Sequence, residues 1–341
     1  MRAGPRAAQP GGGKAAVPGA GRAAGTILET QEFHFLLLPE FSVMGFASAV
    51  EPLRVANRFV PEAYRWKILS LDGGPVRASN GMSLNVDGAL ASAQAVQTLF
   101  VVAGFNPLQQ YQSALGDALR QLDRQGATLG AIDTGAFVLA QARLLRGRPV
   151  TLHWEAQSAF KERFPALTVT QELFEWGERR ISCAGGTAAM DMVLALIGQR
   201  HGQALAATVS EQFLHGPVRS PSEHQRTEVV ARFGVHDKKL VQAIQTMQAH
   251  LEEVMAIDAL AAAMGVTRRQ MERLFAAHLQ VSPAAFYLSL RLDRARQLLE
   301  QSDMDVMAIA VACGFAAPSH FSRAYRRRFG VRPKDERSRK R

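Results

Sequence analysis

An internal repeat in the last third of the 341-residue chain limits most strongly what this sequence can fold into. The segments 257–283 and 306–333 each read as a short alanine-rich helix, a glycine turn and a longer basic helix. Gly265 of the first copy matches Gly314 of the second at an offset of 49 residues. Such a turn needs a positive φ, which glycine adopts without strain. The repeat therefore predicts two helix-turn-helix motifs in tandem.

The second helix of each copy has an apolar face and a polar face. The residues expected to be buried are Met271, Leu274, Phe275 and either His278 or Leu279 in the first copy, and Phe321, Ala324, Tyr325 and Phe329 in the second. Side chains on the polar faces suit base edges and phosphates. We predict DNA contacts from Arg268, Arg269, Gln270, Arg273, Ser319, His320, Ser322, Arg323, Arg326 and Arg327.

A helix predicted over 284–301 joins the two copies and would hold them at a fixed separation. Two motifs on one rigid body could read adjacent major-groove segments, about 34 Å apart on B-DNA. The alternative is a small helical bundle whose arginines are merely solvated. The presence of a second copy and the placement of charge favour DNA binding.

The net charge of +10 is concentrated at the two ends of the chain. Residues 1–26 carry +4, residues 319–341 carry +8, and the remainder carries −2. A near-neutral body with a basic C-terminal end is typical of a protein whose basic segment meets phosphate. A solubilising charged tail is the alternative interpretation.

The first half of the chain follows a different pattern, in which short apolar runs alternate with helical segments. Strands are predicted over 33–38, 64–71, 98–104, 127–133 and 179–184. This alternation predicts an α/β fold with a parallel sheet covered by helices on both faces. We expect a disordered extension over 1–27, an α/β domain over 28–202, a linker over 203–235 and an all-α domain over 236–336.

Composition excludes several classes of protein. No run approaches the ~18 apolar residues that cross a bilayer, so no membrane association is expected. The N-terminal segment lacks the apolar core of a secretory signal, and a mis-assigned start codon would also explain it. With only Cys183 and Cys313, neither a disulfide framework nor a thiolate metal site is expected, which fits a reducing cytoplasm. We predict no metal and no cofactor.

The stretch GAIDTGAFVLAQARLL (130–145) predicts a strand, a sharp turn and a helix, the arrangement that holds catalytic nucleophiles in some α/β enzymes. The residue at the tip is Asp133 instead of serine or cysteine. A carboxylate can act as a nucleophile. It can also cap the helix or contact a ligand, and we favour these two roles.

His153 has two interpretations: a former general base near this turn, or a packed histidine or ligand contact. We favour the second interpretation because the turn has no thiol for a base to activate. Cys183 lies within a predicted strand, where a buried, inert thiol is expected. We therefore predict no catalytic residue and no enzymatic activity.

Aromatic residues cluster at predicted strand ends and helix starts: Phe41, Phe46, Phe105, Phe137, Trp154 and Trp176. Together with Asp133 or Glu40 they could form an aromatic, partly anionic pocket for a cationic metabolite. Taken singly, each aromatic is more often part of the core. The residues that we expect to contact a ligand are Asp133, Thr134, His153, Trp154, Phe41 and Phe105.

The last hundred residues resemble the AraC/XylS family of transcription regulators. The resemblance rests on RLDRARQLL, IAVACGF and above all GFAAPSHFSRAYRRRFG, which stands where the family has its signature pattern. Tyr325 replaces the usual phenylalanine and keeps its aromatic role in the core. The resemblance implies a tandem helix-turn-helix domain that binds promoter DNA.

The first half resembles the PfpI-like, class I glutamine amidotransferase-like domain, through DTGAFVLAQARLLRGRPVTLHW and SCAGGTAAMDMVLALI. Enzymes of that fold carry cysteine where Asp133 stands. Joined to an AraC-type domain, this domain is typical of the GlxA group, and the chain is most similar to regulators of glycine betaine, carnitine or arginine catabolism. The resemblance implies a flavodoxin-like sensor domain, a small-molecule effector, transcription activation, RNA polymerase as a partner and a homodimer.

Two other functions stay open on the sequence. One is an amidase, protease or deglycase that carries a DNA-targeting module, which needs a nucleophile in the cleft. The other is an architectural protein without a ligand, against which the sizeable α/β domain argues.

Overall fold

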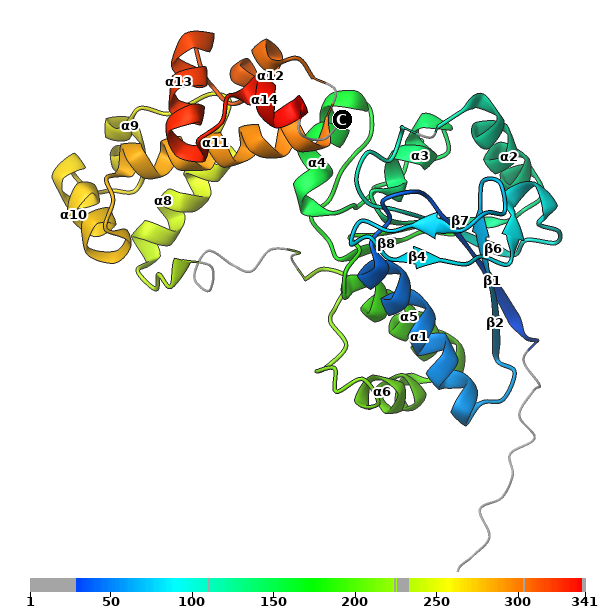
Figure 1. Cartoon of the computed structure of the whole chain (residues 1–341). Coiled ribbons are helices and arrows are strands. Elements are labelled where there is room, and N and C mark those ends of the chain that lie inside the picture. Colours follow the sequence, from blue (N-terminus) through cyan, green and yellow to red (C-terminus); the bar gives the residue numbers. More distant parts are fainter. Residues whose placement is uncertain (1–28, 110, 224, 226–232, 303, 339–341) are drawn as a thin grey trace, which may run out of the picture.

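The computed structural model describes residues 29–109, 111–223, 225, 233–302 and 304–338. The predicted N-terminal extension lies entirely outside this range, as does part of the predicted linker. Two domains follow one another along the chain: an α/β domain and a helical domain (Figure 1). Both parts of the predicted fold class are confirmed.

The α/β domain is built on a seven-stranded sheet in the order β5-β2-β1-β6-β7-β9-β8. All neighbouring strands are parallel except β8 and β9. The strands are β1 (Gln31–Leu37), β2 (Tyr64–Ser70), β5 (Gly88–Ala89), β6 (Thr98–Ala103), β7 (Thr128–Asp133), β8 (Phe174–Trp176) and β9 (Arg180–Cys183). A separate hairpin pairs β3 (Val76–Arg77) with β4 (Ser83–Leu84).

Helices cover both faces of the sheet because successive side chains of a strand point to opposite faces. In β1, Phe33, Phe35 and Leu37 pack on the side of α1 (Val43–Phe59) and α5 (Ala188–His201). Leu36 packs on the opposite side. The helices there are α2 (Ser113–Arg124), α3 (Gly135–Gln141) and α4 (Gln157–Arg163).

A further helix, α6 (Gln203–Glu211), lies within the range that the sequence predicts as a linker. It packs against α1 and α5 and thus adds to one layer of the α/β domain. Ordered structure therefore continues beyond the last predicted helix of this domain.

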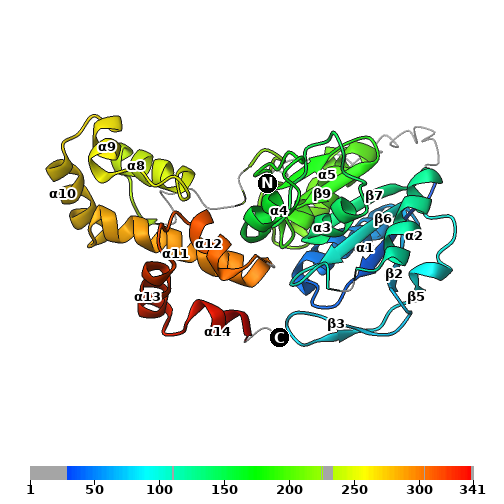
Figure 2. The same ribbon diagram turned by 90° about the horizontal axis from the view of Figure 1, so that it is seen from above.

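The helical domain contains the tandem motifs that the repeat predicts. Its helices are α8 (Lys238–Ala249), α9 (Ile257–Ala263), α10 (Arg268–Leu279), α11 (Pro283–Gln301), α12 (Val306–Ala312), α13 (Pro318–Phe329) and α14 (Pro333–Ser338). α11 links α9–α10 to α12–α13, and its C-terminal part lies beside the α/β domain in both views (Figures 1 and 2). Within the described residues, no helix is long and apolar enough to cross a membrane.

Candidate functional sites

Asp133 occupies the tip of a sharp strand-to-helix turn, as the sequence predicts. It is the last residue of β7 and has a φ of 61°, in the left-handed region. α3 begins two residues later at Gly135, where a Cβ atom would lie 2.1 Å from the carbonyl oxygen of Val101. Glycine is therefore required for α3 to pack this closely on β6. Thr134 is buried and donates a hydrogen bond of 2.5 Å to the Gly104 carbonyl oxygen.

The Asp133 carboxyl group is largely enclosed by neighbouring backbone, although the residue keeps some exposure to solvent. A Cβ atom on Gly185 would lie 3.0 Å from one of its oxygens, so the turn before α5 closes on it. Burial, reinforced by the negative charge of Glu155, raises the pKa of Asp133 to about 7, while the backbone N–H of Thr134 acts in the opposite direction. The N-cap residue of α3, Thr134, makes no side-chain capping hydrogen bond.

His153 and Trp154 come from the segment that precedes α4. His153 stands before the short helix η2 (Trp154–Ala156), and its ring centroid lies 5.6 Å from that of Trp154. Burial lowers the pKa of His153, and Glu155 raises it. The His153 Nδ1 atom is 3.9 Å from a carboxylate oxygen of Glu155. Glu155 therefore influences both Asp133 and His153, a role that sequence reasoning missed although this residue lies in the same HWEA segment.

The predicted aromatic residues do not surround one open pocket. Phe41 is fully buried, with its ring edge-on to Phe46 at 6.1 Å, and so belongs to the core. Phe105 is 40% exposed. Trp176 pairs with Ile181, which pairs with Gly130, so Trp176 lies away from the strand end that carries Asp133.

No thiol is available for chemistry at this turn. Cys183 is fully buried, as expected, and burial raises its pKa to about 12. A neutral, enclosed thiol is a poor nucleophile. Among the described residues, no group of His, Cys, Asp and Glu is arranged to hold a metal ion.

In the first motif, the predicted DNA-contact residues of α10 differ in whether they already interact with other residues of the protein. Gln270 accepts a hydrogen bond from the Thr267 backbone in a capping box. Arg268 pairs with Glu272 at 3.0 Å and Asp258 at 3.3 Å. Arg269 and Arg273 are exposed and enter no ion pair within the described part of the chain. These two guanidinium groups are therefore the ones most readily directed to an external partner.

In the second motif, α13 buries the face that the sequence predicts. Phe321 and Tyr325 are fully buried. The Tyr325 hydroxyl donates a 3.2 Å hydrogen bond to Glu336 of α14, so tyrosine contributes more here than an aromatic ring. The residues of α13 that are exposed on the other side are Ser319, His320, Arg323, Arg326 and Arg327, with Ser322 partly exposed. The basic face is thus continuous.

The fold and the two sites define a regulator with a flavodoxin-like domain and a tandem helix-turn-helix domain. Residues 34–199 match the DJ-1/PfpI family, and residues 260–339 match a family described as a helix-turn-helix domain. An AraC family transcriptional regulator from Pseudomonas putida superposes on 53% of this chain and 98% of its own, with a TM-score of 0.50 and 28% identity.

Two curated relatives extend the match over most of the chain. The chain is 58% identical to the HTH-type transcriptional regulator CdhR of Pseudomonas aeruginosa, over 91% of this chain and 92% of that protein. It is 43% identical to GbdR of the same species, over 90% and 84%. The chain belongs to the family of HTH-type transcriptional regulators that join a DJ-1/PfpI domain to an AraC-type DNA-binding domain. This confirms the resemblance inferred from the sequence, and the chain is a DNA-binding transcription regulator.

Proposed function

We propose that α10 and α13 read promoter DNA and that a small metabolite bound by the α/β domain controls this binding. The observation that carries the first part is the pair of exposed basic helices held on either side of α11. Two such helices on one scaffold suit successive major-groove segments. The contacts are made by Arg268, Arg269, Gln270, Arg273, Ser319, His320, Ser322, Arg323, Arg326 and Arg327.

Within this set, the burial and pairing of the side chains support a division of labour. Arg269, Arg273 and Arg323 are exposed and are assigned to base edges or phosphates. Gln270 and Arg268 first stabilise α10, through the capping box and the ion pair with Glu272. Substituting these two residues would therefore change the helix as well as the contact.

The α/β domain acts in this proposal as a receptor and not as a catalyst. Support comes from the enclosed thiol of Cys183, which is a poor nucleophile, and from the presence of Asp133 where enzymes of this fold carry cysteine. The effector is a quaternary amine or an amino acid. Its contacts are proposed to be Asp133, Thr134, His153, Trp154, Phe41 and Phe105. Phe41 and Thr134 are buried, so their part is to support the wall behind the exposed residues.

Several further properties belong to the same proposal. The protein acts in the cytoplasm as an activator, makes contact with RNA polymerase and works as a homodimer. The domain limits 28–202 and 236–336 are retained as working boundaries, with the segment between them as the connection.

Selection of binding sites from random duplex DNA tests the proposal. The intact chain should enrich a defined sequence. Arg269→Ala and Arg323→Ala should each weaken binding to it by about 1–3 kcal/mol, since each removes a base or phosphate contact. Arg124→Ala, on α2 of the α/β domain, is the matched control. Binding by both variants at the intact chain's affinity would show that α10 and α13 do not read the DNA.

The absence of catalysis has its own test. The intact chain and Asp133→Ala are incubated with amide, ester and glyoxal substrates. Neither should show turnover. Turnover by the intact chain that is lost in Asp133→Ala would make the protein an enzyme with a DNA-targeting module.

A further inference from the structure

The α/β domain and the second helix-turn-helix motif share one apolar core. Leu298 and Leu299 of α11 belong to a cluster of buried side chains that also contains Phe137 of α3. The same cluster includes Phe160 of α4 and Phe321 of α13. Burial of apolar surface therefore holds the second motif and the α/β domain together.

The first motif is not part of this core. Met271 and Phe275 of α10 lie in a separate cluster, together with Phe286 and Leu290 from the N-terminal half of α11. The two halves of α11 thus have different partners. The N-terminal half packs on the first motif, and the C-terminal half faces the α/β domain. The second motif is therefore the one whose position depends directly on the α/β domain.

The part of the α/β domain that meets α11 also carries proposed effector contacts. α11 packs against η2 and against α4, which follows η2 in the chain. η2 begins with Trp154, directly after His153. Its Glu155 lies 3.9 Å from the His153 ring and raises the pKa of Asp133 through space. A ligand at the turn that displaces η2 therefore moves an element that α11 touches.

α11 is in turn held to the second motif by polar contacts. Arg291, near the middle of the helix, donates hydrogen bonds to the carbonyl oxygens of Cys313 at 2.7 Å and of Gly314 at 2.6 Å. Its guanidinium carbon lies 4.1 Å from the centre of the Phe315 ring. These three residues form the turn between α12 and α13. A movement of α11 is thus passed to the turn that orients α13.

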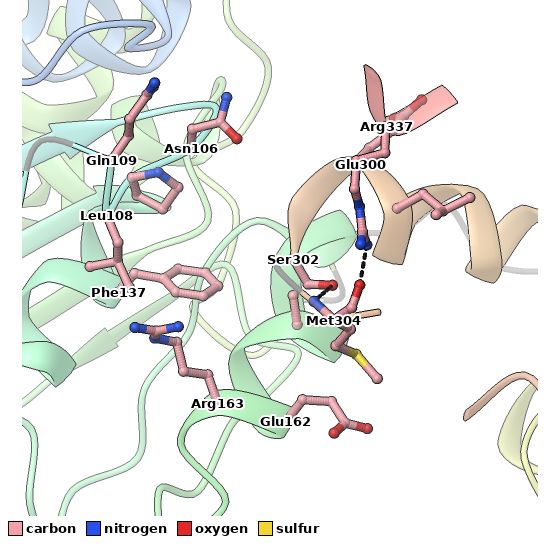
Figure 3. Close-up of a pocket in the computed structure, with 13 residues that line it drawn as sticks. Asn106, Leu108, Gln109, Phe137, Glu162, Arg163, Glu300, Ser302, Met304 and Arg337 are labelled. Carbon is pink, nitrogen blue, oxygen red and sulfur yellow. Dashed lines mark hydrogen bonds between the residues drawn. The ribbon is translucent and has the colours of Figure 1, made fainter. Parts of the chain in front are cut away.

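The junction between the two domains also contains open space. A cavity of about 990 Å³ is lined by Leu108 and Phe137 of the α/β domain and, on the opposite side, by Met304 of the helical domain (Figure 3). Leu299 of α11 lines it as well. Close-packed interiors hold few voids larger than a water molecule. Side chains that face such a cavity are not fixed from across it, so α11 has room to change its position relative to the α/β domain.

We propose that η2 transmits effector binding to the DNA-binding domain: a ligand at the turn displaces η2, η2 displaces α11, and α11 repositions the second motif. This inference rests on the proposed control by an effector, and it adds the route and the motif that responds. Coupling between two binding sites is reciprocal. DNA bound by the second motif must therefore shift the same equilibrium and change the surroundings of η2. This effect can be measured with DNA alone.

Trp154 reports on η2 by its fluorescence. The chain contains three tryptophans, so Trp66→Phe together with Trp176→Phe leaves Trp154 alone. This double variant is titrated with a duplex that the intact chain selects from random DNA, and with a duplex of the same length that lacks the selected sequence. The selected duplex should change the Trp154 emission with the same midpoint as the polarisation of labelled DNA. The other duplex should leave the emission unchanged at the same concentrations.

Two leucines of α11 provide matched variants in this background. Leu299 is buried in the core shared with the α/β domain, and Leu290 is buried in the core of the first motif. Leu299→Ala should at least halve the emission change at saturating DNA, because it loosens the junction. Leu290→Ala removes the same side-chain atoms from the other half of α11 and should keep the full change.

An unchanged Trp154 emission at saturating DNA would overturn the route through η2 and leave the reading of DNA by α10 and α13 standing. This outcome needs neither leucine variant, so it does not depend on their stability. Equal emission changes in Leu299→Ala and Leu290→Ala would also overturn the route, since the signal would then not pass through the junction. Absence of sequence-specific DNA binding by the intact chain would contradict the proposed function itself, and this inference with it.

Discussion

Asp133 is partly buried, and this burial together with the negative charge of Glu155 makes ionisation of its carboxyl group costly. Its backbone is left-handed, a conformation that asparagine and aspartate tolerate better than other residues with a side chain. Asparagine can thus replace Asp133 with the same shape and no charge. This makes the effect of the charge measurable by itself.

The contribution of Asp133 to the stability of the α/β domain should fall as the pH rises from about 4 to about 7. The pKa of Asp133 is raised from 3.8 to about 7, so the unfolded chain releases this proton first. The free energy of unfolding then drops by up to ~1.4 kcal/mol per pH unit over this window, and the contribution is constant below and above it. Asp133→Asn removes this contribution and should be more stable than the intact chain at pH 8, while the lowered pKa values of His34, His153 and His201 keep their opposite effect in both proteins.

Tryptophan fluorescence measures this directly, because Trp66, Trp154 and Trp176 all lie in the α/β domain. Thermal midpoints are recorded between pH 4 and pH 8. Asp117→Asn is the control, since this exposed residue pairs with Arg120 at the surface. Parallel pH profiles for Asp133→Asn and the intact chain would show that the Asp133 charge is not buried.

At the scale of single residues, the sequence predicts the turn of the candidate site but not all of the residues around it. The turn that carries Asp133 follows from an apolar run, a Thr-Gly pair and a helical pattern, all within sixteen residues. The sequence left open whether Phe41 lines a pocket or belongs to the core, because its burial follows from bridges to Ala78 and Gly104, which are distant in sequence. The effect of Glu155 on the pKa of Asp133 also acts through space, so it could not be predicted from the pattern of residues along the chain.

Among the elements, the two turn glycines of the repeat occupy different surroundings. Both have positive φ, 63° at Gly265 and 71° at Gly314. A Cβ atom on Gly265 would meet nothing within 4 Å. One on Gly314 would lie 2.5 Å from a Val254 side-chain carbon and 2.7 Å from the Glu252 carbonyl oxygen. Gly314 thus lies where the second motif touches the segment between α8 and α9.

Gly314→Ala should destabilise the helical domain more than Gly265→Ala. Both variants bear the strain of a left-handed alanine, about 1–2 kcal/mol. Gly314→Ala adds the cost of an extra carbon in a packed site, about 1–3 kcal/mol. Urea unfolding followed by far-UV circular dichroism measures the difference. Equal losses of stability would mean that Gly314 does not touch the segment between α8 and α9.

The sequence predicts long elements of this fold better than short ones. The helices of the repeat follow from apolar residues at helical spacing, and the central strands from buried apolar runs. The hairpin of β3 and β4 and the edge strand β8 have only two or three residues each, too few for a periodic signal. α6 lies in a segment that the sequence predicts as linker because it is polar and interrupted by HGPVRSPSEHQR. The position of α6 depends on packing against α1 and α5, which the sequence pattern does not show.

At the scale of the whole molecule, the segment that follows α6 is held against the α/β domain by hydrogen bonds and ion pairs before the chain reaches the helical domain. Asp191 of α5 is fully buried and accepts hydrogen bonds from the Arg219 backbone at 2.8 Å and from its guanidinium group at 2.7 Å. His215 lies 3.1 Å from the same carboxylate. Further along, Gln225 donates to the Thr151 hydroxyl at 2.8 Å, close in sequence to His153. This connection therefore runs past the segment that carries the candidate effector residues.

Arg219→Met should release this connection and destabilise the α/β domain. The substitution leaves Asp191 buried without its main partner, which typically costs about 3–5 kcal/mol. The expected results are a lower thermal midpoint by tryptophan fluorescence and faster proteolysis within 212–225.

Arg58→Met is the matched control, because the exposed Arg58 donates a 3.0 Å hydrogen bond to Gln212 of the same connection. Its loss should cost less than about 1 kcal/mol. Adding Asp191→Leu to Arg219→Met removes the unpaired charge and should recover part of the loss, which a double-mutant cycle measures. If Arg219→Met and Arg58→Met lower the midpoint equally, the Asp191 carboxylate does not fasten the connection.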